Sequence, residues 1–106
     1  MSANTAGFVV VDVWKVKPGK EESIREVLAA AHRKFSERPE ILSVDYCLAG
    51  GDPSRYLVVF RYTSEEAREA FVQTEELKVT MQTLQDYWDL DDVFVKGPAS
   101  DLPRFD

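Results

Sequence analysis

Hydrophobic and polar positions along this chain follow two patterns, one typical of strands and one typical of helices. From Arg55 to Tyr62, β-branched and aromatic residues occupy both alternation faces, which favours a central strand covered on both sides. Similar runs lie between turn signals such as Pro18-Gly19 and the segment 50–54. The predicted strands span residues 8–16, 41–49, 55–62 and 89–96.

The helical pattern, with apolar residues at spacings of three and four, occurs in three segments. Between Glu21 and about Arg38, the apolar stripe consists of Ile24, Val27, Leu28, Ala31 and Phe35. A short second helix is predicted to begin at Thr63, which has capping-box spacing to Glu66. A third is predicted to begin at Thr74, and its stripe contains Leu77, Met81, Leu84 and Trp88.

In chain order these elements form β-α-β-β-α-α-β, the ferredoxin-like arrangement of an α+β domain. We expect a four-stranded antiparallel sheet with helices on one face. The domain is expected to span 8–97, between tails at 1–7 and 98–106, the second of which would lie across a neighbouring chain through Leu102, Pro103 and Phe105. Alternation in the second strand predicts one face with Leu42, Val44, Tyr46 and Leu48, and another with Ile41, Ser43, Asp45 and Cys47.

Such a sheet leaves its other face without helices. By alternation that face carries Val9, Val11, Val13, Leu57, Val59, Val93 and Val95. A patch of this size exceeds what a monomer usually exposes, and a two-fold dimer that pairs the sheet faces would bury it. The sequence therefore predicts a homodimer.

Composition narrows the choice of partners and compartment. The 106 residues carry a net charge of −6, which argues against nucleic acid or an anionic membrane as the main partner. No apolar run is long enough to span a membrane, and the N-terminus lacks the pattern of a signal peptide. The lone Cys47 is more typical of a packed side chain than of a nucleophile and suits a reducing compartment, so we expect a cytoplasmic protein.

Asp12 is the anomalous residue of the first strand, because a carboxylate among valines costs free energy unless it is paired or hydrated. It is either a strand-end group that reaches water or an arginine, such as Arg61 of another chain, or a general base facing the cavity between sheet and helices. Desolvation would raise the pKa of such a carboxyl group and suit it to proton transfer. His32 borders the first helical stripe and is either a rim residue or a proton shuttle.

Aromatic residues share the alternation face of Asp12. They form either ordinary core or the wall of an aromatic pocket, and they are Trp14, Tyr46, Tyr56, Phe60 and Tyr62. The sequence contains no glycine-rich phosphate loop, no Cys-x-x-Cys and no His-x-x-x-His. No metal site is therefore expected.

Three segments resemble the antibiotic biosynthesis monooxygenase family. They are the run from Val9 to Glu22, the motif Asp52-Pro53-x-Arg55-Tyr56, and the segment Tyr62–Ala67. The resemblance spans roughly residues 8–97 and implies a dimeric α+β barrel. Many members of the family are small oxygenases that oxidise quinols or polyketide phenols without metal or flavin, and some relatives degrade haem.

The chain departs from the family pattern at several site positions. Quinol-oxidising relatives often have histidine at the position of Phe71 and another near Glu76. Haem-degrading relatives have asparagine, tryptophan and the histidine ligand at the positions of Asp12, Tyr62 and Met81. Methionine ligates haem iron in some proteins, but Met81 lies in an apolar stripe. We therefore expect colourless protein without haem.

The resemblance and the residues together predict a cofactor-independent monooxygenase that oxidises a quinol or a polyketide-type phenol. Asp12 would act as the base, Tyr62 or Tyr46 would hydrogen-bond the substrate oxygens, and His32 is the next candidate base. The predicted substrate pocket, for a small aromatic molecule, comprises Trp14, Tyr46, Tyr56, Phe60, Phe71 and Met81. Two alternatives stay open: a non-catalytic binding or assembly dimer whose cavity is filled by side chains, and an isomerase or cyclase.

Overall fold

The protein is described by a computed structural model that covers residues 7–98, without the side chains of 93–96 and 98. Most of the two predicted tails, including Leu102, Pro103 and Phe105, lies outside the described residues. The elements follow the predicted order: β1 Phe8–Val16, α1 Ser23–Ser36, β2 Ile41–Leu48, a short 3-10 turn η2 Ala49–Gly51, β3 Arg55–Tyr62, α2 Glu65–Val72, α3 Glu75–Leu84 and β4 Trp88–Pro98.

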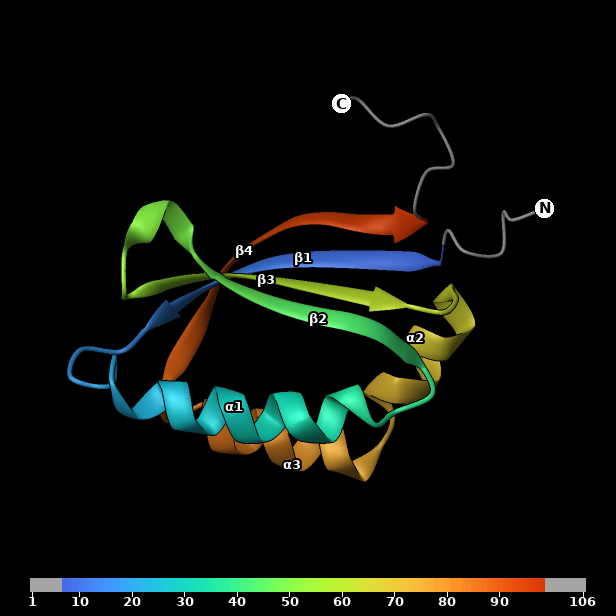
Figure 1. The fold of residues 1–106 in the computed structure, drawn as a ribbon, viewed down its shortest axis with the longest axis horizontal. Helices are drawn as coiled ribbons and strands as arrows, with labels where there is room; N and C mark the ends of the chain where they lie inside the picture. Colours follow the sequence, from blue (N-terminus) through green and yellow to red (C-terminus); the bar gives the residue numbers. More distant parts are fainter. Residues whose placement is uncertain (1–6, 99–106) are drawn as a thin grey trace.

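The four strands form one antiparallel sheet in the order β2-β3-β1-β4. Figure 1 shows α1, α2 and α3 on one side of this sheet, which is the predicted ferredoxin-like α+β fold. Register shifts between Val11 and Asp12 and between Val13 and Trp14 interrupt the pairing of β1 with β4. Such bulges bend a strand, and the first half of β4 swings toward the helices in Figure 1.

Regular pairing of β1 with β3 determines which side chains face the helices. Val10 pairs with Phe60, and Asp12 pairs with Val58. Paired residues share a face, so alternate residues of both strands point into the layer between sheet and helices. The buried core in that layer includes Phe8, Val10, Ile24, Leu28, Phe35, Val44, Val58, Tyr62, Phe71 and Leu84.

The predicted faces of β2 are wrong at its first two residues. Ile41 pairs with Tyr62 and Ser43 pairs with Arg61, so the register shifts between them and Leu42 is left over. As a result Ile41 is 8% exposed and packs in the core, whereas Leu42 is 55% exposed. Strict alternation cannot reveal an inserted residue of this kind.

Several predicted helix boundaries also differ from the structure, and α1 is two residues shorter at each end than the predicted span from Glu21 to about Arg38. Ser64, not Thr63, is the N-cap of α2, and its hydroxyl accepts a hydrogen bond of 2.9 Å from the backbone N–H of Ala67. Thr74 caps α3 as predicted. Trp88 does not continue the α3 stripe, because the chain turns at residues 85–87 and Trp88 begins β4.

The second face of the sheet has no helix on it in the described part of the chain (Figure 1). Val9, Val11, Leu57 and Val59 are half-buried there, and Val13 is already buried within one chain. Val93 and Val95, which were expected on the same face, have side chains outside the described set. No helix within residues 7–98 is long and apolar enough to cross a bilayer.

Candidate functional site

A cavity of about 190 Å³ lies between the sheet and the helices. Strand residues from β1, β2 and β3 form one wall, and residues of α1, α2 and α3 form the other. Most of the predicted site residues line it, namely Asp12, Trp14, Tyr46, Phe60, Tyr62, Phe71 and Met81. The alternation of β1 and β3 therefore brings a carboxylate and several aromatic rings to one cavity.

His32 and Tyr56 do not line this cavity. They line a larger, open groove of about 840 Å³ whose walls come mainly from α1 and β2. His32 is exposed, and its ring meets the ring of Tyr46 edge to face. Tyr46 and Leu28 line both hollows, so they stand between the groove and the inner cavity.

Stacked and tilted rings form the wall of the cavity at the Tyr62 end. Phe60 and Tyr62 follow each other on one face of β3, and their rings stack with centroids 5.6 Å apart and an interplanar angle of 17°. Phe71 of α2 is fully buried and meets Phe35 edge to face at 5.4 Å. These contacts form an apolar wall of aromatic rings of the kind that suits an aromatic ligand.

Asp12, Arg68 and the phenols of Tyr46 and Tyr62 place polar groups on the cavity wall among these rings. Burial raises the pKa of the Tyr62 phenol, the positive charge of Arg68 opposes the rise, and the negative charge of Asp12 adds to it. Burial also raises the pKa of Tyr46 to about 12. Both phenols are therefore protonated hydrogen-bond donors at neutral pH.

Arg68 is a site residue that the sequence reading missed. Its side chain is 25% exposed and makes a 3.4 Å ion pair with Glu69, yet it also lines the cavity. The available signal was its spacing from Phe71, because residues three apart share a face of a helix. The periodicity of apolar residues does not identify Arg68, because its side chain is charged.

Trp88 also lines the cavity, although the sequence pattern predicted it in the stripe of α3. Because β4 bends, its first residue packs against the helix-facing side of the sheet, where Trp14 and Trp88 stack with centroids 4.9 Å apart. The Nε1 atom of Trp88 is buried and has no hydrogen-bond partner among the described residues. This donor belongs to a ring that lines the cavity.

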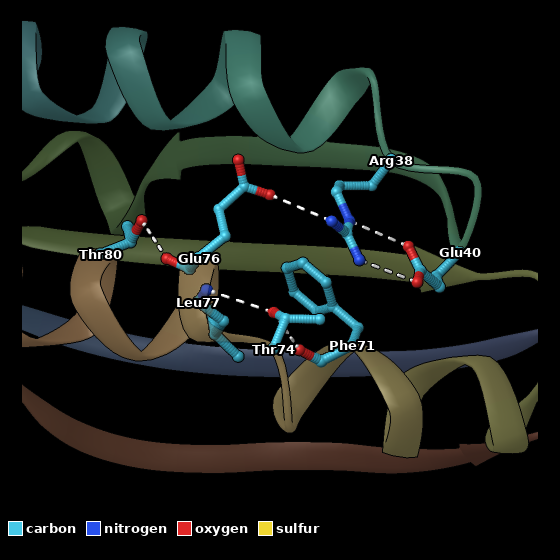
Figure 2. A network of polar contacts seen from close by, with 7 residues as sticks. All are labelled: Arg38, Glu40, Phe71, Thr74, Glu76, Leu77 and Thr80. Atoms are coloured by element: carbon cyan, nitrogen blue, oxygen red, sulfur yellow. Dashed lines mark hydrogen bonds and ion pairs between the residues drawn. The ribbon is translucent and has the colours of Figure 1, made fainter.

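A charged network lies beside Phe71, where α2 meets α3 (Figure 2). The Arg38 guanidinium holds the Glu40 carboxylate through two bonds of 3.0 and 2.9 Å and reaches Glu76 of α3 at 3.4 Å. It lies over the ring of Phe71, with its central carbon 5.8 Å from the ring centroid. Thr74 completes the junction, donating to the Phe71 carbonyl at 2.7 Å and accepting from the Leu77 N–H at 3.2 Å.

Groups that bind metals do not cluster in the described part of the chain. No group of three or more histidine, cysteine, aspartate or glutamate side chains there is arranged to hold a metal ion. Met81 is partly buried and packs against the core. Cys47 is exposed on the edge strand β2, so the prediction that it packs in the interior is wrong.

A comparison with protein-family models identifies one family for this chain. The model of the antibiotic biosynthesis monooxygenase family matches residues 7–83. No curated protein sequence matches the chain.

Solved structures share the fold at low sequence identity. A Deinococcus radiodurans protein bearing the antibiotic biosynthesis monooxygenase name is 9% identical over 92% of this chain and 97% of its own, with a TM-score of 0.78. SnoaB, a cofactor-independent oxygenase from Streptomyces nogalater, is 13% identical over 83% of this chain and 90% of its own, with a TM-score of 0.72. With most of its length matched by the family model, the chain belongs to the antibiotic biosynthesis monooxygenase family.

Proposed function

We propose that this protein is a cofactor-independent monooxygenase that oxidises a quinol or a phenol with molecular oxygen in the cavity between sheet and helices. The observation that carries the proposal is that Asp12 and Tyr62 line one cavity walled by aromatic rings. Family membership supports the reaction class, and the similar fold of SnoaB, itself a cofactor-independent oxygenase, is consistent with it. Fold alone does not determine a reaction, so the argument depends on the site.

The first chemical step assigned to the site is proton removal. Asp12 accepts the proton of the substrate hydroxyl, and the resulting phenolate is electron-rich enough to pass one electron to oxygen. The phenoxyl radical and superoxide then combine at a ring carbon that carries hydrogen, and loss of water leaves a carbonyl there. The sum is phenol plus oxygen to quinone plus water, with no electron drawn from the protein.

The other polar groups stabilise charge and hold the substrate. Tyr62 and Tyr46 keep their protons at neutral pH and are suited to donate to the substrate oxygens. Arg68 places positive charge on the cavity wall, where phenolate and superoxide would form. The stacked rings of Phe60 and Tyr62 support a flat substrate and limit entry of water.

The size of the cavity supports one alternative, a non-catalytic binding dimer. Ligand pockets commonly measure roughly 300–1,000 Å³, and this cavity measures about 190 Å³ because aromatic side chains fill much of the layer. A protein that binds a small aromatic molecule without turning it over fits the same geometry. Turnover separates the two functions.

The assembly proposed for either function is a homodimer that pairs the sheet faces without helices. Val9, Val11 and Val59 remain partly accessible on that face in the single chain. Apolar surface of this kind is usually buried against a partner. A second copy supplies a matching face through two-fold symmetry.

Oxygen uptake by the purified protein tests the enzymatic proposal. The panel consists of monocyclic and polycyclic quinols and phenols, with buffer and heat-denatured protein as controls for autoxidation. We expect one oxygen consumed for each quinone formed, no release of hydrogen peroxide, and no effect of a metal chelator. No uptake above the controls across the panel, with binding intact, would reject the oxygenase proposal, and ligand recovered unchanged would then favour the non-catalytic alternative.

A further inference from the structure

The indole N–H of Trp88 is a buried donor without an acceptor. Trp88 is 4% exposed, and its Nε1 atom has no hydrogen-bond partner among the described residues. Buried tryptophan N–H groups usually find a partner, because desolvating a donor without replacing its hydrogen bond costs free energy. A ligand that brings an acceptor oxygen into the cavity would remove this cost.

The position of Trp88 relative to Asp12 defines where such a ligand lies. Trp88 packs face to face on Trp14, and Asp12 and Trp14 are successive residues on the same face of β1. Successive same-face positions of a strand are roughly 6.6 Å apart. Trp88, which carries the unpartnered donor, and Asp12, which carries the carboxylate, therefore line neighbouring parts of one cavity.

The volume of the cavity limits the ligand further. An apolar cavity of roughly 150 Å³ in another protein is large enough to bind benzene. The present cavity, at about 190 Å³, holds one substituted ring or a compact pair of fused rings. A linear system of three or more rings exceeds this space.

We propose that the ligand is a phenol of one ring, or of two fused rings, that carries a second oxygen acceptor, and that Trp88 Nε1 donates a hydrogen bond to this acceptor. The hydroxyl group then lies toward Asp12 and Tyr62. Trp88 is accordingly a ligand-binding and specificity-determining residue. That the ligand is a phenol rests on the proposed function, whereas the donor and the size limit rest on the cavity itself.

A matched pair of ligands tests the donor without any turnover. Para-hydroxyacetophenone has a carbonyl oxygen where para-ethylphenol has none, and the two have nearly the same size. We expect the ketone to bind ~10-fold more tightly in anaerobic calorimetry, the scale of one buried hydrogen bond. The chain contains two tryptophans, so its ¹⁵N spectrum has two indole signals, and that of Trp88 should move more with the ketone than with the ethyl compound.

Variants separate the donor from the ring. Trp88→Phe should abolish the preference for the ketone while para-ethylphenol binds within ~3-fold of wild type. Trp14→Phe, a change in the stacked neighbour that also lines the cavity, should alter the binding of both ligands alike and so keep the preference. If Trp88→Phe fails to fold, the inference is still tested on the wild-type protein, by its affinities for the two ligands and by the shifts of its indole signals.

Three results would overturn the inference. They are equal binding of the matched pair, a Trp88 indole signal that does not respond to the carbonyl, and hydroxyanthraquinone binding as tightly as the single-ring ketone. Failure of the oxygenase proposal gives a different result, namely ketone binding through Trp88 with no oxygen uptake on any quinol. Oxygen uptake without a contribution from Trp88 would reject the present inference alone.

Discussion

The rings of His32 and Tyr46 meet edge to face, with centroids 5.9 Å apart and an interplanar angle of 66°. Tyr46 belongs to both hollows, whereas His32 belongs to the outer groove alone. The tyrosine ring thus stands between the histidine and the inner cavity where Asp12 lies. Of the two candidate bases, the structure places Asp12 with the aromatic wall and His32 outside it.

His32→Gln should therefore change turnover of a quinol by less than about threefold, because proton transfer needs hydrogen-bond contact or one bridging water. The pH dependence of kcat/KM should also stay unchanged. The measurement is oxygen uptake across the pH range with the best substrate of the panel. A large loss, with unchanged melting temperature, would place His32 in the reaction and shift the site toward the groove.

Asp12→Asn should lower turnover by ~10²-fold or more, the usual scale for loss of a general base. The substitution is nearly isosteric, so fold and assembly should persist, which circular dichroism and sedimentation would verify. Tyr62→Phe should cost less, because its phenol orients the substrate rather than taking the proton. Full activity of Asp12→Asn would mean that another group removes the proton.

Raising the pH should lower the free energy of unfolding, because the buried phenol of Tyr46 then loses its proton. Its phenol has an ordinary pKa of 10.0 and is raised by burial to about 12 in the folded chain. Folding thus favours the neutral form of Tyr46. The contribution of this phenol to the stability of the fold is therefore fully present below pH 10 and is lost as the pH rises toward 12. Tyr46→Phe should reduce the alkaline loss by on the order of 1 kcal/mol, allowing for partial exposure of the ring. Urea unfolding below pH 10 and near pH 12 gives the comparison.

Acid should remove the contribution of Glu40 to the stability of the fold. Its hydrogen bonds to Arg38 hold the pKa of this carboxyl group below the ordinary 4.5, so its contribution is present above pH 4.5 and disappears as the pH falls through the lowered value. Glu40→Gln should lower the melting temperature near neutral pH and have no effect in acid. Glu69→Gln is the matched control, because the Glu69 carboxylate is 60% exposed in its pair with Arg68. Equal melting temperatures of wild type and Glu40→Gln at both pH values would mean that the Arg38 network does not stabilise the fold.

Periodicity was sufficient to predict the sheet and its helices, because burial of one face imposes a period of two on strands and of about 3.6 on helices. It failed at Ile41 and Leu42, where an inserted residue reverses the alternation and only the pairing with Tyr62 shows it. It also assigned Trp88 to a helix, since the spacing of apolar residues continues across the turn after Leu84.

The candidate site was predictable where it lies on regular strands and not where it depends on tertiary arrangement. Asp12, Phe60 and Tyr62 reach the cavity by simple alternation on β1 and β3. Arg68 joins them only because α2 packs against the end of β3, and no period of apolar residues selects an arginine. His32 borders the correct helical stripe, but its place in the outer groove depends on the ring of Tyr46 beside it.

The sheet face without helices offers the sharpest test of assembly. Val59 lies on this face and pairs with Val11 on one side and Asp45 on the other. A lysine at position 59 would lie opposite Asp45 within one chain, where opposite charges across strands are tolerated or favourable. In a dimer that pairs these faces, the same ammonium group would be buried against valines, at a large cost in free energy.

Val59→Lys should therefore yield a folded monomer at micromolar concentration, whereas the wild-type chain should sediment as a dimer. Val79→Lys is the matched control, because Val79 is 50% exposed on α3 and distant in the fold from this face, so it should leave the dimer intact. Sedimentation equilibrium gives the masses, and circular dichroism establishes that each variant is folded. A Val59→Lys protein that remains dimeric would place the interface elsewhere, for example along the edge strand β2. A monomeric wild type would mean that one chain tolerates its valine face in water.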